Sequence, residues 1–263
     1  MAGRDMFHVQ AEAYDRFVGR YSPQLAAALC DFAGIENGRR ALDVGAGPGA
    51  LTAELAKRVG AANVVAAEPS EPFAHACRAR VPGVEVVEAG AEAIPLPNDA
   101  FDATLSQLVL NFLPDARPAL REMSRVTRAG GVIAACVWDY SGEMEMLRAF
   151  WDAAQEVSPA RAAEHDEATM RLGREGELAA LWQEAGLLRI RSTPLRVRAR
   201  YANLDDLWSS FLGGVGPAGA FTVSLGEEDQ AALRAALALR LGAGDEPFEL
   251  SARAWAVAGT VAG

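Results

Sequence analysis

The sequence is poor in lysine, histidine and cysteine. Of its 25 basic residues only Lys57 is a lysine. Its three cysteines lie far apart, without a CxxC pair or a histidine-rich partner segment. This pattern excludes a disulfide framework and offers no zinc-ligand spacing, so we expect a reducing compartment and no metal site.

Long hydrophobic runs are also absent. The N-terminal "MAGRDMFHVQ" has no apolar stretch after its charges, so we expect no signal peptide. The longest apolar run, residues 130–138, is about half as long as a membrane span. These absences predict a soluble, cytoplasmic protein with no membrane partner.

Acidic residues outnumber basic residues by 35 to 25, which gives a net charge of −10. Such a chain is repelled by phosphate backbones, which argues against nucleic acid as a partner. The chain has 263 residues, and 51% of them are hydrophobic. It can therefore form one large α/β domain, or a domain with an inserted cap.

From residue 39 to about residue 138, short β-rich runs alternate with helical patterns. The last of these helical stretches, residues 116–131, ends in a glycine pair that is typical of a helix stop. Continuous apolar strands separated by helices predict a parallel sheet covered on both faces. The predicted strands are residues 40–45, 63–69, 84–89, 101–107 and 131–138, followed later by 187–201 and 248–261.

The flanking segments are predicted to be mainly helical. One or two helices precede the first strand. The polar residues 158–175 are predicted to be a mobile connection or cap, and the glycine-rich residues 213–220 a flexible turn. The helices predicted after the fifth strand are residues 143–157, 176–186, 204–212 and 227–241.

A glycine-rich turn joins the first predicted strand to its helix in "RALDVGAGPGALTAEL". The missing Cβ atoms of Gly45, Gly47 and Gly49 let a ligand approach the backbone, and the helix start offers N–H groups to an anion. With Glu68 about 20 residues on, the turn also fits the dinucleotide fingerprint. Asp43 favours a different ligand, because its carboxylate repels a pyrophosphate and attracts an ammonium group. A ligand with both an amino group and a ribose therefore fits better.

Consecutive motifs along the chain resemble class I S-adenosylmethionine-dependent methyltransferases of the small-molecule, quinone-biosynthesis-like branch. The motifs are "LDVGAGPGALTAEL", "VVAAEPS", "AGAEAIPLPNDAFDATLSQLVLNFLPD" and "ALREMSRVTRAGGVIAACVWD". The resemblance implies an α/β, Rossmann-like seven-stranded sheet, mostly parallel with an antiparallel final strand, helices on both faces and a helical cap. It implies a single domain over residues 1–263, with a core of about 36–140 plus the C-terminal strands and a cap formed by 1–35, 143–180 and 203–241.

The resemblance also implies the cofactor, S-adenosylmethionine. The glycine loop would hold its methionine part with Asp43 near the amino group, and Glu68 would bind both ribose hydroxyls. Where members often carry an Asp this chain has Gly90, which leaves the backbone of Ala91 and the carboxylate of Glu92 for the adenine. The cofactor-binding residues implied within the core are Asp43, Gly45, Ala46, Gly47, Gly49, Glu68, Pro69, Ala91, Glu92, Gln107 and Leu108.

Several of these residues also have a simpler interpretation. Glu92 could equally be a solvated loop charge, and Gln107 and Leu108 could merely pack at the end of a strand. In the N-terminal segment, Tyr14 and Arg20 match an aromatic and an arginine that lie against the cofactor in similar members, the arginine pairing with its carboxylate. The same segment fits an amphipathic helix whose aromatic residues pack on the domain.

Methyl transfer from a sulfonium is an in-line displacement, so alignment and exclusion of water matter most. A general base is needed only where the acceptor loses a proton. His8, His75 and His165 are weak candidates, and no catalytic residue is assigned. The arginines of residues 187–201 are predicted to be the polar face of half-exposed strands rather than an anion site.

We therefore predict an enzyme that methylates a small-molecule acceptor and releases S-adenosylhomocysteine. The acceptor, its methylated atom and the oligomeric state are not indicated by the sequence. Two other classes stay open: a flavin- or nicotinamide-dependent oxidoreductase, and a non-catalytic cofactor-binding module.

Overall fold

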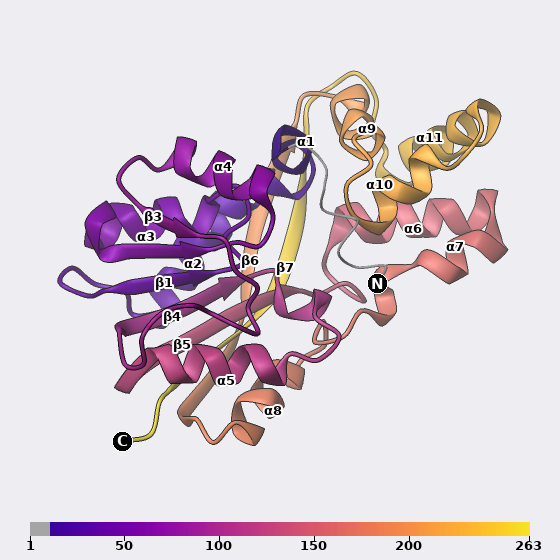
Figure 1. The fold of residues 1–263 in the computed structure, drawn as a ribbon. Helices are drawn as coiled ribbons and strands as arrows, with labels where there is room; N and C mark the ends of the chain where they lie inside the picture. Colours follow the sequence, from indigo (N-terminus) through magenta and orange to yellow (C-terminus); the bar gives the residue numbers. More distant parts are fainter. Residues whose placement is uncertain (1–10) are drawn as a thin grey trace. The chain divides into compact units, whose positions relative to one another are not determined.

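The computed structural model describes residues 11–263, which form an α/β fold divided into two compact units (Figure 1). We call them the sheet unit and the helical unit. Among the described residues, the sheet unit comprises Ser22–Trp138, Arg171–Leu195 and Ala254–Gly263, and the helical unit comprises residues 11–21, Asp139–Met170 and Arg196–Arg253.

The strands form one seven-stranded sheet with the order β3-β2-β1-β4-β5-β7-β6. Pairing is parallel from β3 to β5, whereas β7 runs antiparallel to β5. The prediction of a seven-stranded, mostly parallel sheet with an antiparallel final strand is confirmed. The strands are β1 (Ala41–Val44), β2 (Val64–Ala67), β3 (Glu85–Val87), β4 (Phe101–Gln107), β5 (Thr127–Trp138), β6 (Leu188–Tyr201) and β7 (Phe248–Thr260).

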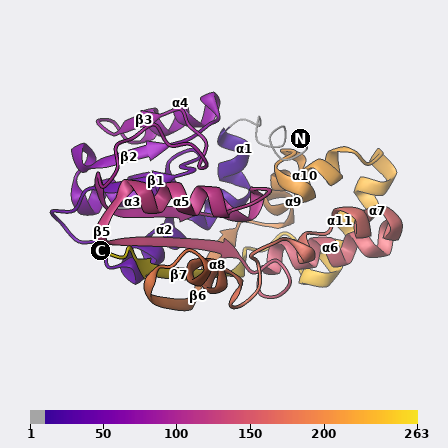
Figure 2. The same ribbon diagram turned by 60° about the horizontal axis from the view of Figure 1, so that its bottom comes forward.

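Helices cover both faces of the sheet, because the strand order reverses at β1 and β4. The chain moves from β1 through α3 to β2 in one direction, and from β4 through α5 to β5 in the other. Right-handed crossovers in opposite directions put α3 and α5 on opposite faces, as Figures 1 and 2 show. The helices of the sheet unit are α2 (Ser22–Ala33), α3 (Ala50–Val59), α4 (Glu71–Arg80), α5 (Arg117–Val126) and α8 (Glu177–Glu184).

The boundaries of the predicted cap differ from those of the helical unit. α2, predicted as part of the cap, packs against α3, where Arg58 donates to the Ala27 carbonyl at 3.1 Å. α8 also belongs to the sheet unit, where the Trp182 indole donates to the Ile133 carbonyl at 3.2 Å. The assignment of the whole chain to one domain stays a prediction.

α5 ends at Val126, well before the glycine pair that was expected to stop it. The backbone is already extended at Thr127, whose hydroxyl donates to the Met123 carbonyl one turn back, at 2.7 Å. Gly130 and Gly131 lie in β5 and form two hydrogen bonds with Val261, both 3.0 Å long. The predicted helix end is therefore wrong, because the glycine pair serves strand pairing.

The helical unit has an aromatic core. Phe150 stacks on Phe211 with ring centres 4.4 Å apart, and Trp151 meets Phe221 at 5.4 Å. The helices predicted at 204–212 and 227–241 are confirmed as α9 and α11. The unit contains α1 (Ala11–Arg16), η2 (Val18–Arg20), α6 (Glu145–Val157), α7 (Pro159–His165), η5 (Glu167–Thr169), α9 (Leu204–Leu212), α10 (Gly216–Val223) and α11 (Glu227–Leu241).

Two segments, predicted as a mobile connection or cap and as a flexible turn, contain helices of this unit. The polar residues 158–175 include α7 and η5, where Arg148 fixes Asp166 through two bonds of 2.8 and 3.0 Å. The glycine-rich residues 213–220 include the start of α10. A Cβ on Gly219 would lie 2.7 Å from the carbonyl carbon of Gly214. Glycine permits close packing there rather than flexibility.

No helix within residues 11–263 is both long enough and apolar enough to cross a membrane.

Candidate functional site

The candidate site lies at the carboxyl ends of β1 and β4, where the strand order reverses. β1 leads into the glycine loop, Gly45–Gly49, and then into α3. The N–H groups of Gly45 and Ala46 both donate to the Ala67 carbonyl at the end of β2, at 2.8 and 3.1 Å. Ligands of open parallel sheets bind at such a reversal. The loop is therefore in the expected place and is held there by the neighbouring strand.

The three glycines of the loop have different neighbours. A Cβ on Gly45 would lie 2.5 Å from Cγ2 of Val109, and a Cβ on Gly49 would lie 2.9 Å from the sulfur of Cys77. A Cβ on Gly47 would have no atom within 4 Å. All three glycines have positive φ. Gly45 and Gly49 therefore allow tight packing, and Gly47 faces open space that a ligand can enter.

Asp43 is a completely buried carboxylate at the end of β1. Its Oδ2 accepts a hydrogen bond of 2.6 Å from the Thr52 hydroxyl, and its Oδ1 has no hydrogen-bond partner among the described residues. Burial raises the pKa of Asp43 to about 7, and the bonds from Thr52 oppose that rise. A buried carboxylate with an unpaired oxygen is unfavourable unless a donor completes it. Asp43 therefore suits a positively charged donor.

Glu68, directly after β2, is almost completely buried. Its Oε2 accepts from the Gly47 N–H at 2.8 Å, and its Oε1 accepts from the Ser70 N–H at 2.9 Å. Burial raises the pKa of Glu68, while these two N–H groups lower it. Each carboxylate oxygen accepts about two hydrogen bonds, so both can take a further donor, such as a hydroxyl. The adjacent Pro69 is exposed.

The residues predicted on the adenine side form a turn after β3, in which the Ala93 N–H donates to the Gly90 carbonyl at 3.2 Å. Ala91 is buried and Glu92 is half-buried. A Cβ on Gly90 would lie 3.2 Å from Oε2 of Glu92. The turn therefore has a carboxylate beside position 90, although residue 90 itself has no side chain.

Gln107 and Leu108 end β4 next to the loop. Leu108 has a φ of +62°, which is uncommon for a residue with a Cβ, and its N–H donates to the Cys136 carbonyl at 2.9 Å. The Gln107 amide donates to the Ser22 carbonyl at 3.3 Å, and its Oε1 is buried without a partner among the described residues. A strained backbone and an unpaired polar atom at one strand end are typical of a ligand site.

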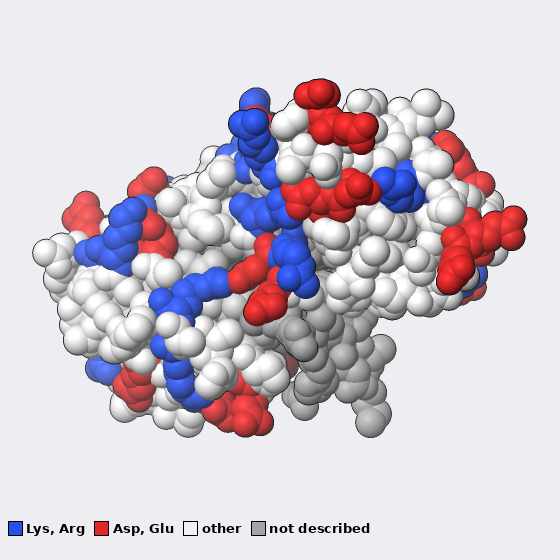
Figure 3. Space-filling view, turned by 90° about the horizontal axis from the view of Figure 1, so that it is seen from above, with Lys and Arg blue, Asp and Glu red and all other residues white. Residues whose placement is uncertain are grey.

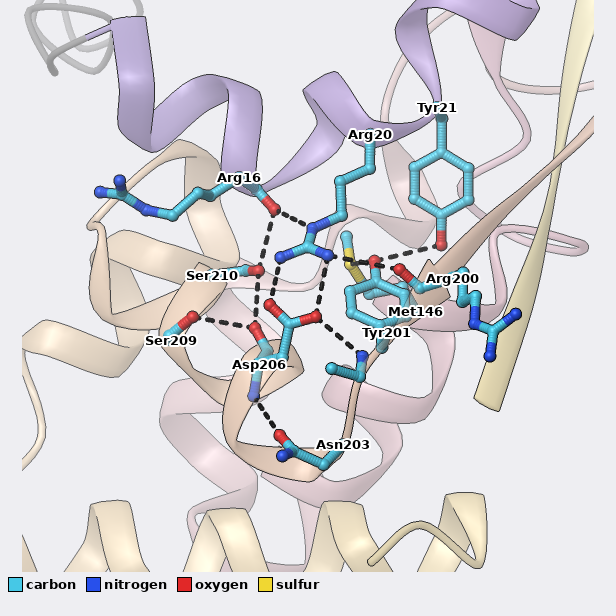
Figure 4. A network of polar contacts seen from close by, with 11 residues as sticks. Arg16, Arg20, Tyr21, Met146, Arg200, Tyr201, Asn203, Asp206, Ser209 and Ser210 are labelled. Atoms are coloured by element: carbon cyan, nitrogen blue, oxygen red, sulfur yellow. Dashed lines mark hydrogen bonds and ion pairs between the residues drawn. The ribbon is translucent and has the colours of Figure 1, made fainter. Parts of the chain in front are cut away.

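Tyr14 and Arg20 lie in the helical unit, on α1 and η2. The Arg20 guanidinium makes two bonds to the Asp206 carboxylate, one of them 2.9 Å long (Figure 4). It also lies 4.9 Å from the ring centre of Tyr201. Phe17 and Tyr21 of the same segment are buried, which confirms their packing, although they lie at the two ends of η2 and not on one amphipathic helix with Tyr14. Arg20 is thus engaged within its own unit, and the cofactor contacts of Tyr14 and Arg20 stay predictions.

The remaining candidates do not gather at the glycine loop. His75 on α4 and His165 on α7 are both exposed, and His8 lies outside the described residues. The arginines of β6 are exposed, which confirms the predicted polar strand face. No group of three or more His, Cys, Asp or Glu side chains in residues 11–263 could hold a metal ion.

Two buried residues below the loop, Thr52 and Cys77, were missed by the sequence analysis. The Thr52 hydroxyl donates to Asp43 and accepts from the Cys77 thiol, whose sulfur is 3.6 Å away. A hydroxyl residue in the first turn of the helix after the loop is the signal that could have identified Thr52, because such side chains bond to nearby polar groups.

Comparison with known proteins agrees with this geometry. The model of the methyltransferase domain family matches residues 42–135. Malonyl-[acyl-carrier protein] O-methyltransferase of Salmonella typhimurium is 32% identical over 157 residues, which are 57% of this chain and 61% of that protein. The ubiquinone/menaquinone biosynthesis C-methyltransferase UbiE of Cronobacter sakazakii is 35% identical over 108 residues, 38% of this chain and 43% of that protein. The chain thus spans less than two thirds of both relatives.

A solved SAM-dependent methyltransferase of Thermotoga maritima has the same fold. It superposes with a TM-score of 0.53 at 19% identity and covers 94% of each chain.

Proposed function

The chain belongs, through residues 42–135, to the class I S-adenosylmethionine-dependent methyltransferases, and on this premise we propose that it transfers a methyl group from S-adenosylmethionine to a small organic acceptor. S-adenosylhomocysteine is the second product. The observation that carries the proposal is the completely buried Asp43, whose Oδ1 lacks a partner among the described residues. A pyrophosphate would be repelled by this carboxylate, whereas the ammonium group of an amino acid would complete it.

The residues around Asp43 fit the other parts of the same cofactor. Gly47 leaves open space beside the loop, so the methionine part can approach the backbone. Both oxygens of Glu68 accept one N–H bond and can each accept a ribose hydroxyl. Ala91, Glu92 and Leu108 are the residues that we propose for the adenine.

When bound, S-adenosylmethionine supplies a methyl group on a positively charged sulfur. The work of the chain is then to orient the cofactor and to exclude water from the reacting atoms. A general base is required only for an acceptor that must lose a proton. The proposed reaction therefore needs no catalytic dyad, and we assign none.

We propose a small molecule as acceptor rather than nucleic acid. The net charge of −10 disfavours a polyanion, and acidic and basic side chains are interspersed on the face shown in Figure 3. The two curated relatives are named for different reactions, O-methylation of malonyl-[acyl-carrier protein] and C-methylation in ubiquinone/menaquinone biosynthesis, so neither acceptor is assigned here. A cytoplasmic location likewise stays a prediction.

Thermal unfolding with S-adenosylhomocysteine, NAD and FAD tests the cofactor. A ligand that binds the native state at 100 times its Kd stabilises it by about 2.7 kcal/mol, which is a rise in Tm of roughly 5–8 °C. We expect that rise with S-adenosylhomocysteine alone. A rise with NAD or FAD instead would support an oxidoreductase. If S-adenosylhomocysteine binds but no methyl transfer is detected in a broad acceptor screen, the chain is a binding module.

A further inference from the structure

A chain of three buried polar groups lies beneath the glycine loop. The Cys77 thiol of α4 donates to the Thr52 hydroxyl of α3, with 3.6 Å between sulfur and oxygen. The Thr52 hydroxyl donates in turn to Oδ2 of Asp43, at 2.6 Å. All three side chains are completely buried. Water therefore does not compete for these bonds, and each group depends on its protein partner.

The direction of the bonds in this chain is fixed while Asp43 is ionised. A hydroxyl has a single proton, and a carboxylate can only accept, so the Thr52 proton points to Asp43. The second lone pair of the hydroxyl is then available to the Cys77 thiol. Thr52 thus holds Oδ2, and Oδ1 is left without a partner among the described residues. Oδ2 is therefore held by a hydrogen bond, and Oδ1 can accept one from a ligand.

We propose that Thr52 is a positioning residue for the cofactor: its hydroxyl, directed by Cys77, holds the Asp43 carboxylate in the orientation and charge state that accept the ammonium group. This inference rests on the proposed function. It assigns a role to a side chain that does not itself touch the cofactor.

The electrostatic surroundings of Asp43 make this hydroxyl important. Burial raises the pKa of Asp43 to about 7, and the bonds from Thr52 lower it. The other titratable groups that face Asp43 are Glu68 from β2, Cys77 from α4 and Cys30 from α2. None of these is a cation. Without the hydroxyl, a larger share of Asp43 is protonated at neutral pH and cannot pair with an ammonium group.

Calorimetric titration with S-adenosylhomocysteine from pH 6 to pH 8.5 tests the inference on wild type, Thr52→Val, Thr52→Ala and Thr52→Ser. Wild-type affinity should rise by roughly 10-fold from pH 6 to pH 8, as a group titrating near 7 ionises. Loss of one buried bond to a charged acceptor raises its pKa by about one to two units. Thr52→Val and Thr52→Ala should therefore bind about 5- to 50-fold more weakly at pH 7, and this deficit should shrink towards pH 8.5. Thr52→Ser should stay within about 3-fold of wild type.

Thr104→Val is the matched control, because it removes a buried hydroxyl of β4 that bonds Thr127 and not Asp43. It should leave the pH profile unchanged. A deficit in Thr52→Val and Thr52→Ala that is equal at all pH values would overturn the inference, because it would indicate packing damage only. A wild-type affinity that does not change with pH would also overturn the inference, and this measurement does not depend on the folding of any variant. If wild type does not bind S-adenosylhomocysteine at all, the proposed function fails as well.

Discussion

The glycine loop Gly45–Gly49 and residues 213–220 are similar in composition, but Gly47 of the first and Gly219 of the second have opposite surroundings. In the loop, Gly47 has no atom within 4 Å of its Cβ position, and its N–H group bonds Glu68. In the second segment, Gly219 presses on the backbone of Gly214. The first segment joins a strand to a helix, and the second is the start of α10. A run of glycines therefore indicates close approach, but not whether a ligand or the chain itself approaches.

The largest effect that separates the two segments is expected for Gly219→Ala. The new methyl group would overlap the Gly214 backbone, which cannot move as a flexible side chain can. We expect a loss of about 2–4 kcal/mol in unfolding free energy, measured by urea denaturation, and a change in S-adenosylhomocysteine affinity below about 3-fold. Gly226→Ala is the matched control, since nothing lies within 4 Å of that position. Equal stability of the two variants would contradict the packing role.

Glu68→Gln tests whether the cofactor binds at the glycine loop. The substitution keeps the size of the side chain but turns one acceptor oxygen into a donor, which then faces the Gly47 or Ser70 N–H group. We expect cofactor affinity to fall about 10- to 100-fold, or roughly 1.4–2.8 kcal/mol, with the fold intact. Calorimetry with S-adenosylhomocysteine measures the change, and circular dichroism controls for folding. Unchanged affinity would mean that Glu68 only holds the loop.

Gly47→Ala sharpens the contrast within the loop. Because the position is open, the methyl group costs only the strain of a positive φ, about 1 kcal/mol of stability. It would, however, fill the space that we assign to the cofactor, so affinity should fall roughly 10-fold. Gly34→Ala is the matched control, because Gly34 also has a positive φ and nothing within 4 Å of its Cβ position, but lies after α2. It should lose similar stability and no affinity. Equal binding by both variants would place the cofactor elsewhere.

The sheet could be predicted well because the composition of each strand reflects how the strand is buried. "ALDV" and "VVAA" are continuous apolar runs, and such runs fit only strands that are covered on both faces. The positions of the candidate site residues at these strand ends were predictable for the same reason. Asp43, Gly47 and Glu68 follow from the position of the turn and its spacing to the next strand.

Features that depend on contacts between distant segments could not be predicted. Gly219 looked flexible because its neighbour Gly214 packs against it only after the chain folds. The Thr52 hydroxyl accepts a hydrogen bond from Cys77, which lies 25 residues later in the chain. The ion pair of Arg20 with Asp206 joins residues 186 positions apart, so the local sequence did not indicate it. The sequence pattern of one segment does not indicate which distant residue it will contact.

The smallest effect is expected from replacing one buried acid in each unit, Asp43 in the sheet unit and Glu167 in the helical unit. Burial raises the pKa of each to about 7, and Glu167 accepts one bond of 3.0 Å from the Trp151 indole. The folded state therefore binds more protons than the unfolded state between about pH 4 and 7, so each acid lowers stability as the pH rises through that window.

Asp43→Asn and Glu167→Gln remove this titration while keeping an acceptor oxygen for Thr52 and for Trp151. The pKa of Asp43 is raised by about three units, which limits the gain in unfolding free energy to about 4 kcal/mol. The gain is smaller than this limit because a buried amide adds donors that also need partners. We therefore expect each variant to gain about 1 kcal/mol over wild type at pH 8 and little at pH 5, measured by urea denaturation without ligand. Only Asp43→Asn should also weaken S-adenosylhomocysteine binding. A gain in unfolding free energy that is equal at pH 5 and pH 8 would show that the buried charge of neither acid destabilises the folded state. A loss of binding in Glu167→Gln would show that the acid in the helical unit also serves the cofactor.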